Sequence, residues 1–72
     1  MVITEVMFKA FTEVNKGTKC NIHRVYIYDT NGSLLVCICT DYVIINECNI
    51  EMYQGNNYIG LITDKFSKVE ME

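Results

Sequence analysis

The stretch SLLVCICTDYVII, from Ser33 to Ile45, decides the fold of this chain. Every residue from Leu34 to Cys39 is apolar, so both sides of an extended strand would be apolar there. A half-exposed strand alternates apolar and polar residues, whereas a strand with two apolar faces needs cover on both of them. The stretch therefore predicts a strand inside the fold, and the rest of the chain has to provide its cover.

Strand signals lie on both sides of this stretch. Residues 23–28 alternate, with Tyr26 and Tyr28 on one face, and Asn31-Gly32 follows, which is the strongest short-range hairpin signal. Residues 23–28 are therefore expected to pair antiparallel with residues 33–39. Gly60 predicts a bulge or a close backbone approach. The further expected strands are 42–46, 50–53 and 58–63, with 69–71 as a short edge strand or a frayed end.

Residues 2–15 carry the pattern of an amphipathic helix. Its apolar residues recur at spacings of three and four, which gathers them on one side, and Gly17 follows the expected end. Phe8 projects outside this stripe, among polar residues, and is a candidate anchor for another molecule. The stripe expected to be buried consists of Ile3, Val6, Met7, Ala10, Phe11 and Val14. The fold class that follows is α+β, a single small domain over residues 1–72, with one N-terminal amphipathic helix packed on an antiparallel β-meander of four to five strands.

One short helix covers only one side of such a sheet. Leaving large side chains on the other side in water would forgo roughly 1.5–3 kcal/mol each. Either the sheet curls over its own second face, as a small barrel does, or two copies stack sheet to sheet, and so short a chain favours the homodimer. The residues expected in the dimer contact or the core of the sheet are Leu34, Val36, Ile38, Val43 and Ile45.

The composition indicates a cytoplasmic globular protein of 72 residues, half of them apolar, with no cofactor. No apolar run approaches the ~20 residues of a membrane helix, and the N-terminus lacks the basic and apolar regions of a signal peptide. The spacing of the four cysteines is not that of a zinc site, which favours reduced, buried thiols. The cysteines are Cys20, Cys37, Cys39 and Cys48.

No combination of residues supports an enzyme. His23 is the single histidine, and nothing in the spacing brings a cysteine and an orienting group to it. The four glycines are isolated, so the chain has no phosphate-cradling loop. We therefore expect neither a catalytic residue nor a metal site.

The net charge of −3 is unevenly distributed. Residues 1–24 hold four basic residues and two acids, whereas residues 25–72 hold seven acids and two lysines. A nucleic-acid-binding sheet normally carries a basic stripe, which is missing here. The expected function is a small acidic protein-interaction module whose partner is basic. The candidate contact residues are Phe8, Asp29, Asp41, Glu47, Glu51, Tyr53 and Tyr58.

A basic partner surface is often one that otherwise holds nucleic acid. Small acidic proteins that occlude such a surface include phage and mobile-element inhibitors, anti-CRISPR proteins among them, and this chain has their size and charge. One alternative is a dimeric nucleic-acid-binding regulator that uses the basic loop from Lys16 to Arg24. Another is a metal or redox module built on the cysteines.

Overall fold

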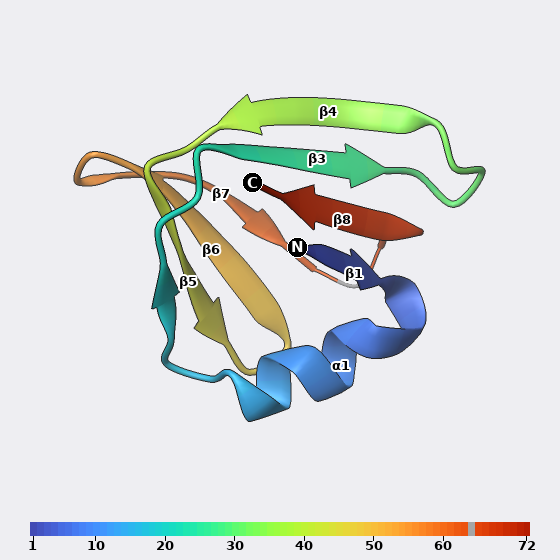
Figure 1. Cartoon of the computed structure of the whole chain (residues 1–72), viewed down its shortest axis with the longest axis horizontal. Coiled ribbons are helices and arrows are strands. Elements are labelled where there is room, and N and C mark those ends of the chain that lie inside the picture. Colours follow the sequence, from blue (N-terminus) through green and yellow to red (C-terminus); the bar gives the residue numbers. More distant parts are fainter. Residues whose placement is uncertain (64) are drawn as a thin grey trace.

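The computed structural model describes residues 1–63 and 65–72. Its single helix and its antiparallel sheets confirm the α+β class, with eight strands where four to five were expected (Figure 1). The elements in chain order are β1 (Val2–Thr4), α1 (Glu5–Val14), β2 (Lys19–Cys20), β3 (Arg24–Tyr28), β4 (Leu34–Cys39), β5 (Tyr42–Asn46), β6 (Asn49–Gln54), β7 (Asn57–Ile62) and β8 (Lys68–Met71).

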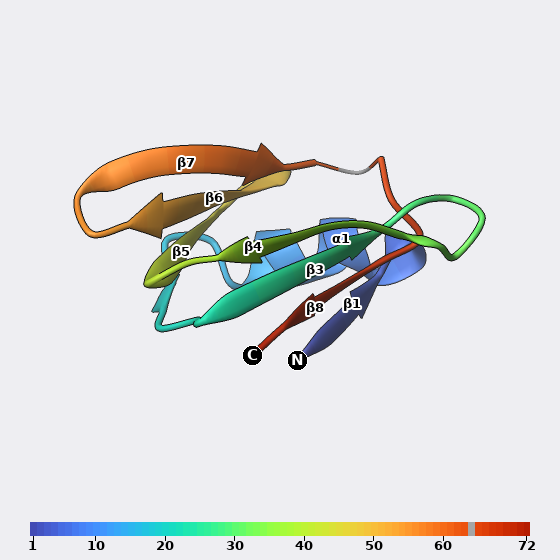
Figure 2. The same cartoon turned by 90° about the horizontal axis from the view of Figure 1, so that it is seen from above.

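The strands form two four-stranded sheets that face each other. We call the sheet with the strand order β1-β8-β3-β4 sheet A, and the sheet with the order β2-β5-β6-β7 sheet B. Figure 2 shows the β6–β7 hairpin on one side of the molecule and strands β3, β8 and β1 of sheet A on the other, and Figure 1 shows α1 running along the bottom of the molecule. The chain passes from β4 in sheet A to β5 in sheet B through Thr40 and Asp41, so a second sheet of the same chain covers the inner face of the first.

The pairing register places one apolar face of each sheet toward the other. In sheet B, Ile45 pairs with Ile50, and Ile50 pairs with Ile62. Because directly opposite residues of an antiparallel pair point the same way, these rows form continuous apolar bands. The core cluster of buried apolar residues is Ile3, Phe8, Ile22, Val25, Val43, Ile45, Ile50, Met52, Ile62, Phe66, Val69 and Met71. Both sheets and α1 contribute to it, so one copy of the chain covers its own core.

The β3–β4 and β6–β7 hairpins are those that the sequence predicts. Residues of β3 pair antiparallel with β4, and β6 pairs with β7 across the turn at Gly55, as expected. The bulge expected at Gly60 is confirmed by a register shift beside it, because Gly60 pairs with Met52 whereas Tyr58 pairs with Tyr53. A Cβ at Gly60 would also lie 2.9 Å from the Cε of the Met52 side chain. The last strand differs from the expected edge strand or frayed end: β8 lies between β1 and β3, in the interior of sheet A.

The helix is shorter than the expected 2–15, and only part of the expected stripe is buried: Ile3 belongs to the core and Phe11 packs against it. Residues 2–4 form β1, which pairs with β8, and the helix begins at Glu5. Phe8, which we expected outside the buried stripe, is 2% exposed and meets Phe66 edge to face at 5.1 Å between ring centroids. Val6 and Val14 of the expected buried stripe are instead 90% and 83% exposed. Within residues 1–63 and 65–72, no helix has the length and apolar character needed to cross a membrane.

The contacts at the two ends of α1 explain which side of the helix is buried. The backbone N–H of Glu5 donates to the carbonyl of Ser67 at 2.9 Å, directly after the β1–β8 pairing, and this fixes the rotation of the first turn. At the other end of α1, the hydroxyl of Thr12 accepts a hydrogen bond from the Cys48 N–H at 3.3 Å. The helix therefore turns Phe8 and Thr12 inward. An apolar groove of about 440 Å³ runs along its outer side, lined in part by Val6, Ala10 and Val14.

The position of β4 in its sheet also differs from the predicted one. It forms the edge of sheet A, and Leu34 and Val36 are exposed and lie outside the core. Ile38 is partly buried against the core, whereas Val43 and Ile45 belong to it as expected. We expected a stacked homodimer because one helix covers only one side of the sheet. Sheet B covers the other side within a single chain, so the core does not require a second copy.

Candidate protein-interaction surface

The outer face of sheet B gathers side chains from four strands. Register pairs Tyr42 with Tyr53, and Tyr53 with Tyr58, so three tyrosines form one row across β5, β6 and β7. A second row runs beside it and contains Lys19, Ile44, Glu51 and Leu61. We call Tyr42, Tyr53, Tyr58, Glu51 and Leu61 the tyrosine face.

The three rings contact one another. Tyr42 and Tyr53 stack with centroids 5.0 Å apart and an angle of 7° between their planes. Tyr58 meets Tyr53 edge to face at 5.8 Å and 75°. Stacked and edge-to-face pairs contribute about 0.5–1.5 kcal/mol beyond the area they bury. Tyr58 stays 57% exposed, and Leu61 beside it is also exposed, so the row ends in an open apolar surface at the edge of the sheet.

A carboxylate is hydrogen-bonded into this row. The hydroxyl of Tyr53 donates to Oε2 of Glu51 at 2.6 Å. This hydrogen bond to Glu51 raises the pKa of Tyr53 to about 12, with smaller contributions from desolvation and from the negative charge of Glu51. Because the ionised Glu51 accepts this bond, the face carries a fixed negative charge next to two aromatic rings.

A cation–π contact and hydrogen bonds also hold residues in place at the margins of the tyrosine face. The Lys19 ammonium lies over the Tyr42 ring at 4.1 Å from its centroid, which is the geometry of a cation–π contact. The backbone N–H of Asp41 donates to the carbonyl of Tyr53 at 2.9 Å, and the Asp41 carboxylate accepts a hydrogen bond from the Gly55 N–H. Asp41 therefore lies at the tyrosine end of the sheet, where the chain enters β5 and the β6–β7 turn closes.

This arrangement suits a positively charged, planar group. A guanidinium can lie on an exposed tyrosine ring while its N–H groups donate to a neighbouring carboxylate. Tyr58 offers the exposed ring, and Asp41 and Glu51 offer carboxylates near the same row. The structure thus brings together four of the predicted contact residues: Asp41, Glu51, Tyr53 and Tyr58.

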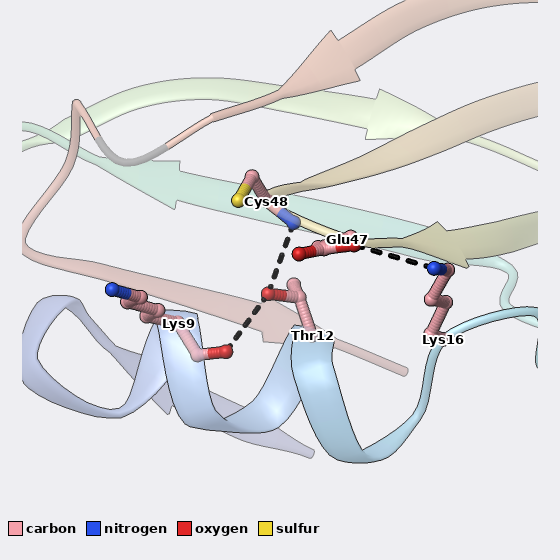
Figure 3. Close-up of polar contacts among 5 residues, drawn as sticks. All are labelled: Lys9, Thr12, Lys16, Glu47 and Cys48. Carbon is pink, nitrogen blue, oxygen red and sulfur yellow. Dashed lines mark hydrogen bonds and ion pairs between the residues drawn. The ribbon is translucent and has the colours of Figure 1, made fainter.

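The other predicted contact residues lie elsewhere. Figure 3 shows Glu47 in the β5–β6 turn, where its carboxylate pairs with the Lys16 ammonium at 3.2 Å. Asp29 closes the β3–β4 turn, and its carboxylate accepts hydrogen bonds from the N–H groups of Asn31 and Ser33. Phe8 is in the core and is unavailable to a partner.

Tyr42 and Leu61 belong to the face although we did not select them from the sequence. The signal that would have found them is strand phase: Tyr42 precedes the inward Val43 by one residue, and Leu61 precedes the inward Ile62. Knowing which face of each strand is buried is enough to place both outside. That knowledge requires the sheet pairing.

The basic loop does not form one surface. Lys16 is paired with Glu47, and Lys19 lies over Tyr42 on sheet B. Arg24 begins β3 in sheet A, the other sheet. The cations that the nucleic-acid hypothesis combined are therefore divided between different parts of the molecule, and two of them are already in contact with a carboxylate or a ring.

The cysteines are not buried as expected. Cys37, Cys39 and Cys48 are exposed, and Cys20 is half-buried. Cys48 has a left-handed backbone with φ of 69°, in the turn of Figure 3. Among residues 1–63 and 65–72, no group of three or more His, Cys, Asp and Glu side chains is placed to hold a metal ion.

Comparison of the chain with protein-family models, with curated proteins and with solved structures finds no match. The function proposed below is therefore inferred from the surface geometry.

Proposed function

We propose that this chain is a non-enzymatic protein-interaction module whose tyrosine face binds an arginine-bearing, basic surface of another protein. The observation that carries the proposal is the row of three contacting tyrosines from three strands, with Glu51 hydrogen-bonded into it. Tyrosine is enriched in binding hot spots because it offers a rigid ring and a polar hydroxyl together.

The contacts inside the molecule support the choice of a cationic partner. Lys19 already lies over Tyr42, and Lys68 lies over Tyr28 at 4.5 Å from the ring centroid. Tyr42 and Tyr28 thus each take a lysine ammonium on the face of the ring. Tyr58, at the edge of sheet B, is the most exposed ring of the tyrosine face and offers the same geometry to a second molecule.

The charge of the chain supports the same class of partner. Residues 25–64 contain neither lysine nor arginine, and they include all of β5, β6 and β7. An acidic sheet steers a basic surface toward it and repels nucleic acid. A basic protein surface commonly holds nucleic acid, so we propose a role as an inhibitor that occludes such a surface, of the kind made by phages and mobile elements, including anti-CRISPR proteins.

The experiment compares baits that differ in one surface only. Tagged wild-type protein, Tyr58→Ser, Glu51→Gln and Glu47→Gln would be used to capture proteins from the natural host, with the bound proteins identified by mass spectrometry. Glu51→Gln and Glu47→Gln remove the same charge, but only Glu51 lies on the tyrosine face. We expect one basic, nucleic-acid-handling protein that is retained by wild type and Glu47→Gln and is lost with Tyr58→Ser and Glu51→Gln.

Two results would contradict the proposal. Equal loss with Glu47→Gln and Glu51→Gln would mean that net charge, and not the tyrosine face, governs binding. Retention of an acidic or uncharged partner by all four baits would show that the contact is made by another surface. Binding of the purified pair should also weaken steeply as salt is raised, because charge attraction contributes to it.

A further inference from the structure

We propose that the outer edge of β4 pairs with β4 of a second copy, antiparallel, around a two-fold axis at Cys37. This interface lies on sheet A and is separate from the tyrosine face on sheet B. Figure 1 shows β4 along the top of the molecule, with β3 below it and no strand drawn above it. The proposal differs from the stacked homodimer expected from the sequence, because it joins sheet edges and leaves the core unchanged.

Hydrogen bonds in the neighbouring strands show which backbone groups point to the outer edge. Arg24 exchanges two backbone hydrogen bonds with Glu72, both 3.0 Å, so its N–H and C=O point away from β4. Cys39 lies opposite Arg24 in the register, and backbone groups of antiparallel strands alternate sides. The N–H and C=O of Cys39, and of Cys37 two residues earlier, therefore point away from β3. A strand of a second copy would satisfy these groups.

The side chains of β4 favour an uncharged partner strand. Leu34–Cys39 contains no charged residue, and Leu34 and Leu35 are 53% and 64% exposed. Natural proteins protect a sheet edge with charges, proline, short strands or β-bulges. Strand β4 has no charge and no proline, and its one irregularity is the register shift opposite Ile27 and Tyr28, which leaves Leu35 without a partner near the start of the strand. The edge strands β1 and β2 are only three and two residues long, and β7 contains Gly60 in its interior.

A second copy fits this edge better than a different acidic or basic strand. Two copies with net charge −3 each repel, so they can approach closely only where charges are missing, and β4 is such a segment. A strand that pairs with itself around a two-fold axis closes after two copies and leaves no further β4 edge exposed. The apolar residues at the edge then cover their equivalents on the partner.

The two-fold axis also restricts the register. Directly opposite residues share a face, so a residue can lie opposite itself or opposite one an even number of positions away. Placing Cys37 opposite the partner's Cys37 sets Val36 opposite the partner's Ile38, and these central pairs lie in the part of β4 that pairs regularly with β3. The two Cys37 Cα atoms would be about 5.5 Å apart, which is within the range of about 4.4–6.8 Å for a disulfide.

The first test uses this proximity. The purified protein, reduced and then freed of reductant, would be treated with diamide, which takes up two hydrogen atoms as the two thiols become one disulfide. We expect a cross-linked dimer on a non-reducing gel for wild type, Cys39→Ser and Cys48→Ser, and only monomer for Cys37→Ser. Wild type without a cross-link, or Cys37→Ser with one, would overturn the proposed register.

The second test needs no thiol chemistry. Leu35→Lys and Val6→Lys each add one positive charge at an exposed apolar position, on β4 and on α1 respectively. Under reducing conditions, we expect Leu35→Lys to raise the dimer dissociation constant at least about tenfold by sedimentation equilibrium, because it desolvates a lysine in the interface. Val6→Lys should leave the constant unchanged. Dissociation by Val6→Lys alone would place the contact on α1, and a wild-type monomer at all concentrations would refute the dimer.

Discussion

Strands β4 and β5 are adjacent in the sequence and similarly apolar, yet they occupy opposite environments. In β5, which lies between β2 and β6, Val43 and Ile45 are almost completely buried. In β4, which has β3 as its one neighbour among the described strands, no side chain is fully buried. The two segments are separated only by Thr40 and Asp41. An uninterrupted apolar run therefore predicts a strand well and predicts its place in the sheet poorly.

The difference arises from what each strand faces. The inward residues of β5 meet α1 and the apolar band of sheet A, which also contains Ile3 and Val69. β4 ends its sheet, so one of its backbone edges and much of both its faces remain open. The apolar residues of β4 contribute little to the core, which leaves them available for association.

The largest effect on stability should come from comparing a buried residue with an exposed residue within α1. Phe8→Ala removes a buried ring from the core and from its contact with Phe66, and we expect a loss of roughly 3–5 kcal/mol in the free energy of unfolding. Val6→Ala changes an exposed side chain of the same helix and should stay within about 0.5 kcal/mol. Urea unfolding followed by circular dichroism measures both. Equal losses would show that the outer side of α1 is covered in solution.

The second largest effect on stability is expected from matched substitutions in β5 and β4. Ile45→Ala in β5 should cost about 2–5 kcal/mol, because it leaves a cavity in the core. Leu35→Ala in β4 removes a side chain of the same size at an exposed position and should cost less than about 0.5 kcal/mol at concentrations where the protein is monomeric. A large concentration-dependent loss with Leu35→Ala would instead report the edge contact proposed above.

A smaller effect is expected at the junction between the two strands. The buried hydroxyl of Thr40 donates to the carbonyl of Ile22 at 2.6 Å. Thr40→Val keeps the shape of the side chain but leaves that carbonyl without its partner, which should cost about 1–3 kcal/mol. Thr30→Val, in the exposed β3–β4 turn, is the matched control and should have little effect. Denaturant titrations of both variants would show whether the passage from sheet A to sheet B depends on this bond.

The smallest effect concerns the outer face of sheet B. The pKa of Tyr53 is raised from 10.0 to about 12, so the folded protein keeps this proton where the unfolded chain has lost it. The resulting stabilisation is fully present below about pH 10 and is lost as the pH rises toward about 12. In Glu51→Gln, the ultraviolet absorbance of phenolate should show this tyrosine ionising at lower pH. An unchanged titration would contradict the assigned cause.

Much of the local structure could be predicted from the sequence. The Asn31-Gly32 turn, the alternation in residues 50–53 and the apolar run of residues 42–46 each indicate their strand through local spacing alone. The short β1 and β2 were missed because two or three residues carry too little pattern. The tyrosine face was found in part: Glu51, Tyr53 and Tyr58 were selected by residue type, whereas Tyr42 needed the sheet register.

The sequence by itself determined the class of the fold, the hairpins and the chemical character of the acidic, tyrosine-rich half. Spacing and composition act over a few neighbouring residues, so they are sufficient for these features. The tertiary structure alone decided that Phe8 points into the core while Val6 points out, and that β4 is an edge while β5 is central. Those outcomes depend on contacts between residues far apart in the chain, such as Glu5 with Ser67 and Arg24 with Glu72, which local patterns do not encode.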